Sequence, residues 1–265
     1  MDARPIAPLP PGTDFDRSTV RYRRYGPEPA SLWHDGGLHR VLGSGLPVRI
    51  TAAGVAAWGA ATPADLVEID HMLGAGFDLE GLRREHPAVA ALAPGYRPPL
   101  VVDPFESLVT SVTAQQVSLL AARAIRARLV ERLGTAVEHG GAVWYRFPRQ
   151  ADVDGADLAG VGLSRAKERS IRALAVADLD LAGLDDAAVR ERLLALPGIG
   201  PWTVDWFLAR CIGRPDAFAA GDLGVRKAVA RYHSEDAIWP AARVAEACAR
   251  FGRHANLAVH YLLAA

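Results

Sequence analysis

The stretch LLALPGIGPWTVDWFL, residues 193–208, decides the fold of this chain. Apolar residues on both sides of LPGIG (196–200) recur at helical spacing, which predicts a helical hairpin with a tight turn over 186–212. The two glycines permit the positive φ values that such a turn needs and leave its backbone bare. The second helix begins at Pro201 or Trp202, so its free N–H groups and positive dipole end lie beside the turn. This combination predicts a clamp for a phosphate backbone that needs no basic side chain.

A plain helical hairpin with a glycine turn remains the alternative interpretation of this stretch. Bulk charge does not decide between the two, because 30 basic and 30 acidic residues give a formal net charge of zero. Lys167 and Lys227 are the only lysines in the sequence, so there are few candidate amine nucleophiles. The two cysteines are too few to form a zinc site or an iron–sulfur cluster by themselves.

The rest of the chain divides into three parts by composition and periodicity. Residues 1–17 are rich in proline and are expected to form a disordered lead-in. Residues 18–60 alternate and predict a small antiparallel β domain, in which 18–25 would be a strand. From 61 to 265 the period is helical, Asp103 and Ser164 are expected to be helix N-caps, and glycines mark several helix ends. Because no apolar run is long enough to span a membrane and no secretory signal is present, we expect a soluble, cytoplasmic protein.

Asp222 is the second feature that carries chemistry. It lies in AAGDLGVRK (219–227), about twenty residues beyond the hairpin and at the start of the next predicted helix. By itself this position is typical of a helix N-cap. Asp216 also follows the hairpin, but it lies in the turn after Gly213 and matches the pattern less well.

The hairpin, the helix after it and the downstream aspartate together resemble the helix–hairpin–helix (HhH-GPD) DNA glycosylases. Within that superfamily the chain is most similar to the bacterial AlkA-type 3-methyladenine-DNA glycosylases. The resemblance covers 100–265 well and 18–60 loosely, where the family has a small β domain. It implies a mainly α fold, α+β overall, in which a two-lobed helical core at 61–265 follows the β domain.

The resemblance implies that Asp222 is the catalytic carboxylate. An ionised carboxylate beneath the deoxyribose stabilises the positive charge that develops when the glycosidic bond breaks, and it can orient the attacking water. A cationic, alkylated base leaves without being protonated. Bifunctional members have a lysine where this chain has Trp202, so the resemblance implies a monofunctional enzyme without AP lyase activity.

The base pocket implied by the resemblance comprises Trp202, Trp206, Tyr261 and Gln115. Trp202 and Trp206 are i, i+4 neighbours and share a helix face, where an indole would attract a cationic base. Tyr261 stands where the family has a stacking tryptophan. The alternative for both tryptophans is a place in the hydrophobic core.

The polar stretch QQVS (115–118) corresponds to the loop that fills the space left by a flipped base in this family. Gln116 stands where the bacterial enzyme inserts a leucine. The alternative is a solvated kink in a long helix.

The hairpin itself is expected to contact DNA through Gly198, Ile199, Gly200 and Thr203. Family hairpins often hold Na⁺ or K⁺ with backbone carbonyls, which here would come from Leu194, Leu196 and Ile199. No other cofactor is expected.

The sequence therefore predicts a monomeric glycosylase that excises alkylated, cationic purines such as 3-methyladenine from damaged double-stranded DNA in base excision repair. Two alternatives remain open. One is an HhH glycosylase for deaminated, oxidised or bulky bases, and the other is an HhH repair module that binds DNA without catalysis.

Overall fold

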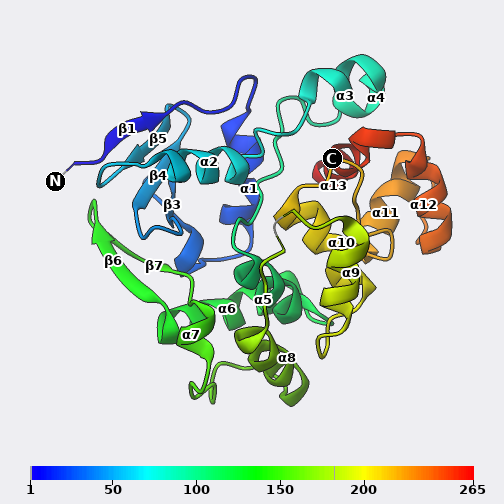
Figure 1. Ribbon diagram of the computed structural model, residues 1–265. Coiled ribbons are helices and arrows are strands. Elements are labelled where there is room, and N and C mark those ends of the chain that lie inside the picture. Colours follow the sequence, from blue (N-terminus) through cyan, green and yellow to red (C-terminus); the bar gives the residue numbers. More distant parts are fainter. Residues whose placement is uncertain (1, 182) are drawn as a thin grey trace.

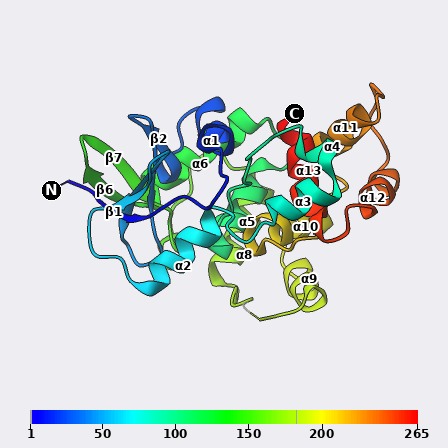
Figure 2. The same cartoon turned by 90° about the horizontal axis from the view of Figure 1, so that it is seen from above.

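The computed structural model describes residues 2–181 and 183–265, and its fold is mainly α-helical with a small antiparallel sheet. In Figure 1 the sheet lies on one side of the molecule, and the helices that follow the hairpin lie on the other. Figure 2 shows the same separation from above. The described helices include none that combines the length and apolar character needed to cross a membrane.

The N-terminal sheet has the strand order β1-β5-β4-β3-β2, all antiparallel. Its strands are β1 (Arg4–Ala7), β2 (Leu32–His34), β3 (Gly37–Val41), β4 (Pro47–Thr51) and β5 (Gly54–Ala57). Two helices pack on it, α1 (Phe15–Arg24) and α2 (Pro63–Met72), and they bury Phe15, Ile69 and Met72 against the sheet's apolar face.

Two predictions for this region are wrong. Residues 2–17 do not form a disordered lead-in, because β1 pairs with β5 at the sheet edge, where a proline without an N–H is tolerated; Met1 lies outside the described residues. Residues 18–25 are not a strand, because 18–24 belong to α1 and Tyr25 is its C-cap. Asp14 caps that helix by accepting the Arg17 N–H at 2.9 Å, and the Asp14 N–H donates to the distant Gly95 carbonyl at 2.7 Å.

The remaining helices form two hydrophobic clusters. The first involves α5 (Pro104–Ala114), α6 (Leu119–Leu133), α8 (Arg165–Val176) and α9 (Asp186–Leu194), and the short α7 (Gln150–Val153) adds Val153. The second involves α3 (Leu79–Glu85), α4 (Pro87–Ala90), α11 (Leu223–Tyr232), α12 (Ala241–Ala249) and α13 (Ala255–Ala264). The N-caps expected at Asp103 and Ser164 are present.

Helix α10 (Pro201–Phe207) belongs to both clusters. Val204 and Phe207 pack into the first cluster, whereas Trp206 packs into the second. The helix continues into a π-helical segment, η2 (Leu208–Ile212). The two helical clusters therefore meet along α10 and η2, and this places residues of α10 at the junction.

The η2 segment is held from outside by three hydrogen bonds to its carbonyl groups. The Asn256 amide donates to Ala209 O at 2.9 Å, and the Val101 N–H donates to Arg210 O at 2.9 Å. His71 Nε2 lies 2.6 Å from Cys211 O. These partners belong to different parts of the chain, so tertiary contacts support the wider π turn.

The helical part also contains a β-hairpin that the sequence analysis did not predict, β6 (Thr135–His139) and β7 (Ala142–Arg146). Its turn residues Gly140 and Gly141 have φ of 58° and 75°, which match a two-residue hairpin turn. Trp144 of β7 packs against Val41 of the sheet, and its indole N–H donates to the Arg40 carbonyl at 3.2 Å. The hairpin thus attaches the helical part to the N-terminal sheet.

Candidate active site

The predicted helical hairpin is formed by α9 and α10 and the turn between them. Gly198 has φ of +75°, whereas Gly200 has φ of −114°, so the expectation of positive φ at both glycines is wrong for Gly200. A Cβ on Gly200 would meet no atom within 4 Å, so the backbone there is open to a ligand. Thr203 and Val204 donate their N–H groups to the Gly200 carbonyl at 2.9 and 3.1 Å, which starts α10.

The turn rests against the first helical cluster through two contacts. A Cβ on Gly198 would overlap the Ser170 hydroxyl of α8, so only glycine allows this approach. Gln115 Nε2 donates to the Gly198 carbonyl at 3.0 Å and to Thr203 Oγ1 at 3.2 Å. The structure therefore places Gln115 under the hairpin, where it supports the turn.

Asp222 caps α11 and holds a carboxylate at the junction of the two clusters. Its Oδ1 accepts the Val225 N–H at 3.1 Å, as expected for an N-cap. Its Oδ2 accepts the indole N–H groups of Trp202 at 3.0 Å and Trp206 at 3.1 Å. Three donors therefore hold the carboxylate in one orientation, and a carboxylate has about four acceptor positions. One position on Oδ1 remains for a further partner.

Gly224 gives this oxygen its space. A Cβ at position 224 would lie 3.0 Å from Asp222 Oδ1 and 3.5 Å from a Leu263 methyl. Any side chain there would crowd the remaining acceptor position. Gly224 is not among the site residues predicted from the sequence, although its place two residues after the aspartate could have suggested it.

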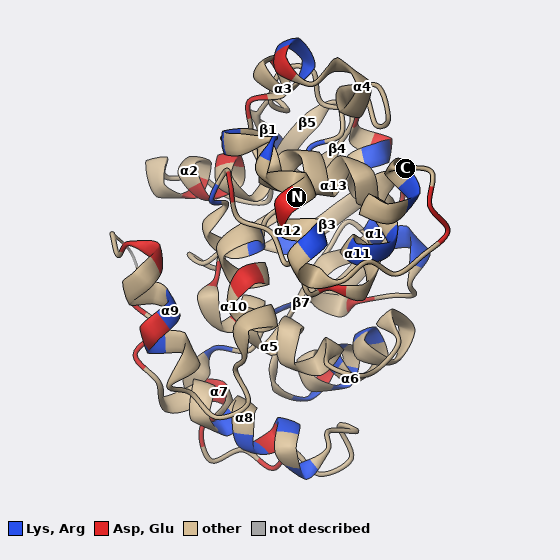
Figure 3. Cartoon of the chain, turned by 90° about the vertical axis from the view of Figure 1, so that its right-hand side faces the viewer, with Lys and Arg blue, Asp and Glu red and all other residues tan. Residues whose placement is uncertain are grey.

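A cavity of about 730 Å³ opens in front of Asp222. Its walls come from α1, from the connection before α5, from α5 and α6, and from α10, η2 and α13. The residues that line it include Arg21, Tyr22, Tyr96, Trp206, Arg210 and His260. Figure 3 shows the blue of basic residues gathered on α1, where Arg17, Arg21, Arg23 and Arg24 lie. The N-terminal domain thus supplies a basic wall to a cavity that the helical core supplies with a carboxylate.

Arg210 and His260 are further cavity residues that the sequence analysis did not identify. The Arg210 guanidinium stacks on Trp206, with Cζ 3.6 Å from the ring centroid, and its Nε lies 3.2 Å from His260 Nε2. Burial lowers the pKa of Arg210 to about 10, and burial beside Arg210 lowers the pKa of His260 to about 3. Arg210 is therefore cationic and His260 neutral at physiological pH. The spacing of Trp202, Trp206 and Arg210, every fourth residue, could have suggested a shared face.

The predicted pocket residues fall into different places. Trp206 is buried and lines the cavity, and Trp202 is half-buried and reaches Asp222 with its edge. Tyr261 is only 2% exposed and packs edge-to-face on Tyr96, with ring centroids 5.8 Å apart, so it lies outside the cavity wall. Its neighbour His260 lines the cavity instead, because successive residues of a helix point about 100° apart.

The loop between α5 and α6 exposes apolar side chains beside Gln116. Gln116 itself has φ of +57°, an uncommon conformation for a residue other than glycine. Val117, Leu119 and Leu120 are 41%, 54% and 63% exposed. The turn therefore carries the exposed Val117 and leads into α6, whose first two residues, Leu119 and Leu120, are also apolar and exposed.

The carbonyls predicted to bind a monovalent cation lie at the end of α9 and in the turn. Leu196 O accepts the Ile199 N–H at 3.2 Å, and a carbonyl oxygen can take a second partner. Leu194 is the last residue of α9, where helix carbonyls lack intrahelical partners. Residues 2–181 and 183–265 contain no cluster of three or more His, Cys, Asp or Glu side chains suited to a metal.

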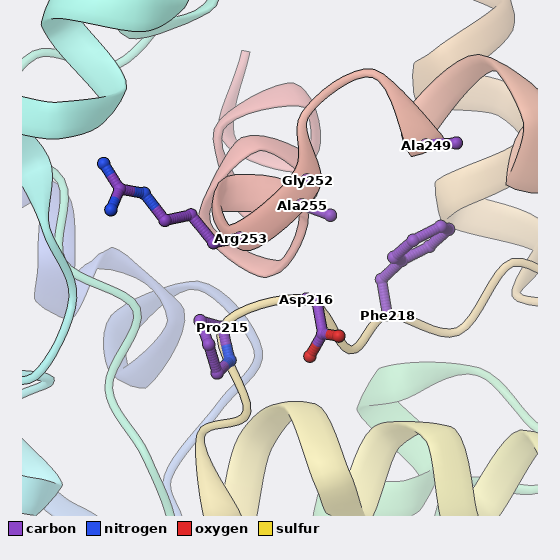
Figure 4. Close-up of a pocket in the computed structure, with 7 residues that line it drawn as sticks. All are labelled: Pro215, Asp216, Phe218, Ala249, Gly252, Arg253 and Ala255. Carbon is purple, nitrogen blue, oxygen red and sulfur yellow. The ribbon is translucent and has the colours of Figure 1, made fainter.

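Asp216 lies in a different hollow, which Figure 4 shows between Pro215, Phe218, Ala249 and the loop before α13. Arg253 also lines it but extends away from Asp216 in this view. Asp216 and Asp222 therefore face different surroundings, and the indole donors are at Asp222.

Comparisons with known proteins agree with this architecture. A family model described as "HhH-GPD superfamily base excision DNA repair protein" matches residues 109–253. "Probable bifunctional transcriptional activator/DNA repair enzyme AlkA" of Mycobacterium tuberculosis (strain ATCC 25618 / H37Rv) is 42% identical over 171 residues, which are 62% of this chain and 33% of that protein. "DNA-3-methyladenine glycosylase" of Bacillus subtilis (strain 168) is 31% identical over 135 residues, 47% of this chain and 45% of that protein. The chain thus matches less than half the length of these two curated relatives.

Among solved structures, 3-methyladenine DNA-glycosylase from Archaeoglobus fulgidus aligns with a TM-score of 0.85 and 25% identity, over 99% of this chain and 97% of that chain. The mainly α fold with its small antiparallel sheet is therefore that of a solved glycosylase. With the family model matching more than half of the 265 residues, the chain belongs to the HhH-GPD superfamily of base excision DNA repair proteins.

Proposed function

We propose that this chain is a monofunctional DNA glycosylase that releases alkylated purines such as 3-methyladenine. One observation carries the proposal: the Asp222 carboxylate faces the cavity and is held by two indole N–H groups and one backbone N–H. Both curated relatives and the aligned archaeal structure carry names that refer to DNA repair or 3-methyladenine. Together these support hydrolysis of an N-glycosidic bond at this carboxylate.

In the reaction, the flipped nucleotide places C1′ of its deoxyribose beside Asp222 Oδ1. The bond from C1′ to the purine nitrogen breaks, and its electron pair leaves with the base, which converts a cationic alkylpurine into a neutral one. The carboxylate stabilises the positive charge on the sugar. Water then bonds to C1′ and gives up a proton, which the carboxylate or solvent accepts. The products are the free base and an abasic sugar.

We infer that water is the nucleophile, because the described residues that line the cavity include no lysine. Lys167 Nζ donates to the Thr113 carbonyl at 2.9 Å, and Lys227 is exposed on α11. Neither lysine lines the cavity. A Schiff base with the sugar needs a neutral amine at C1′, so the arrangement supports an enzyme without lyase activity.

Double-stranded DNA is the proposed partner of the hairpin and of the loop between α5 and α6. The open backbone at Gly200 and the Trp202 N–H at the start of α10 suit a phosphate, whereas Thr203 and Val204 donate to the Gly200 carbonyl. Gln116 and the apolar groups after it suit the space that a flipped base leaves. Na⁺ or K⁺ bound by the carbonyls of Leu194, Leu196 and Ile199 would add a positive charge beside the same phosphate.

The test is incubation of the chain with methylated duplex DNA, followed by chromatography of the released bases. We expect wild type to release 3-methyladenine, and Asp222→Asn to lose most of this release while keeping its affinity for duplex DNA. Asp216→Asn is the matched control, because it removes an aspartate from the separate hollow. Comparable loss in both variants, or no release by wild type, would contradict the proposed role of Asp222. A covalent protein–DNA adduct trapped by borohydride would show a lyase instead.

A further inference from the structure

Arg210 places an unpaired cation inside the cavity. The structure gives it no carboxylate within 4.0 Å over the described ranges, whereas the cavity residues Arg40 and Arg126 pair with Glu106 and Glu28. Burial and the nearby charge of Arg21 lower the pKa of Arg210 to about 10. The group therefore keeps its charge at neutral pH despite the cost of burial, which calls for a partner from outside the chain.

The orientation of the guanidinium is defined by its surroundings. Its Nε donates to His260 Nε2 at 3.2 Å, and His260 Nδ1 then donates to the Asn256 carbonyl at 2.9 Å. His260 can accept in this way because its pKa is lowered to about 3 and the ring is neutral. The Trp206 ring supports the guanidinium from one side.

This arrangement leaves the two terminal amino groups of Arg210 free. Neither makes a hydrogen bond to a described residue, and neither is a buried unsatisfied atom, so both are accessible from the cavity that Arg210 lines. A guanidinium is a donor only and cannot accept. Its partner must therefore present an acceptor.

The position of Arg210 favours a base atom as that acceptor. Trp206 links the two groups, since its N–H bonds Asp222 and its ring carries Arg210. With the sugar at Asp222, a flipped base extends into the buried part of the cavity, while its phosphates stay with the DNA backbone at the surface. Because Arg210 covers one face of Trp206, that face cannot stack on the base.

We infer that Arg210 is a specificity-determining residue that donates to the 6-carbonyl oxygen of the flipped purine. This inference rests on the proposed glycosylase function. 7-Methylguanine has a carbonyl at position 6 that can accept from Arg210, and this hydrogen bond strengthens as the departing base loses its positive charge. 3-Methyladenine has an amino group there, which is itself a donor and gains nothing from a guanidinium.

The test uses the two bases as each other's control. Methylated duplex DNA contains both 7-methylguanine and 3-methyladenine, and the ratio of their initial release rates does not depend on how much enzyme is active. We expect Arg210→Met to lower the ratio of 7-methylguanine to 3-methyladenine release by about tenfold or more, since hydrogen bonds from charged groups are the strong ones. Methionine keeps a flexible apolar side chain over Trp206. Arg210→Lys, which keeps the charge with a more compact donor, should give an intermediate ratio.

Arg243→Met is the matched control. Arg243 of α12 also stacks on a tryptophan, with Cζ 3.5 Å from the Trp239 ring centroid, but it does not line the cavity. Its replacement should leave the ratio unchanged.

An unchanged ratio in both Arg210 variants would overturn the inference and leave the proposed function standing. An equal loss of both bases would also overturn it, and would indicate that Arg210 acts on both bases alike, through Trp206 and Asp222 or through a phosphate. If wild type releases neither base, the proposed function fails and the inference falls with it.

Discussion

Replacing His260 by glutamine would change how the stability of the protein depends on pH. Burial beside Arg210 lowers the pKa of His260 to about 3, from an ordinary value of 6.5. Between these two values the unfolded chain binds a proton at this residue and the folded chain does not. The stability due to neutral His260 is therefore complete above pH 6.5 and is lost as the pH falls towards 3.

The size of the effect follows from that pKa difference. Each pH unit below 6.5 removes about 1.4 kcal/mol, so wild type should lose about 2 kcal/mol through His260 between pH 8 and pH 5. Glutamine does not titrate, but it weakens the contact with Arg210 at a cost of about 1 kcal/mol at pH 8. We therefore expect His260→Gln to be less stable than wild type at pH 8 and more stable at pH 5.

Urea unfolding of both proteins at pH 8, 7, 6 and 5 measures this crossing. The exposed His233, the C-cap residue of α11, provides the control, and the difference between His233→Gln and wild type should not change sign. Stability curves for wild type and His260→Gln that stay parallel across this range would refute a neutral, buried His260.

Three further substitutions test the site. Gly224→Ala should reduce base release by about tenfold, because its Cβ would lie 3.0 Å from Asp222 Oδ1. Tm should change little, because alanine suits a helix. An unchanged kcat would show that the Cβ does not crowd the carboxylate. Gly198→Ala should destabilise the protein by about 2 kcal/mol in urea unfolding, because φ is +75° and the new methyl would meet Ser170. Adding Ser170→Ala should restore only part of the lost stability, because it removes the clash and leaves the backbone strain. Gln115→Ala should weaken binding to undamaged duplex several-fold in fluorescence anisotropy, since each lost hydrogen bond to the turn is worth about 1 kcal/mol. Unaltered affinity would show that Gln115 does not support DNA binding by the hairpin.

Features that depend on neighbouring residues could be predicted from the sequence. The N-caps at Asp103, Ser164 and Asp222 marked the starts of helices α5, α8 and α11, because a cap bonds a backbone N–H three residues away. The hairpin turn and the shared face of Trp202 and Trp206 are local in the same way. The β6–β7 hairpin was predictable too, since Gly140-Gly141 between two short β-like runs is a strong hairpin signal.

Features that depend on distant partners could not be predicted. The alternating pattern of 18–25 favours a strand. The helix that forms there instead is held in part by the hydrogen bond from the Asp14 N–H to the Gly95 carbonyl, 81 residues later. An arginine such as Arg210 is usually a solvated surface residue. Only its contact with His260, fifty residues later, shows that it is held inside a cavity.

The π-helical segment η2 has a consequence for sequence alignments. Over the same length, a π turn holds more residues than an α-helical turn, and here the carbonyls of Ala209, Arg210 and Cys211 each have a partner from another part of the chain. Loss of one residue from 208–212 would convert the wide turn into a regular α-helical turn and leave the residues on either side of it in place. A homologue with a one-residue gap at this place would therefore keep Trp202, Trp206 and Asp222 in position and would change which side chain of this segment faces the cavity.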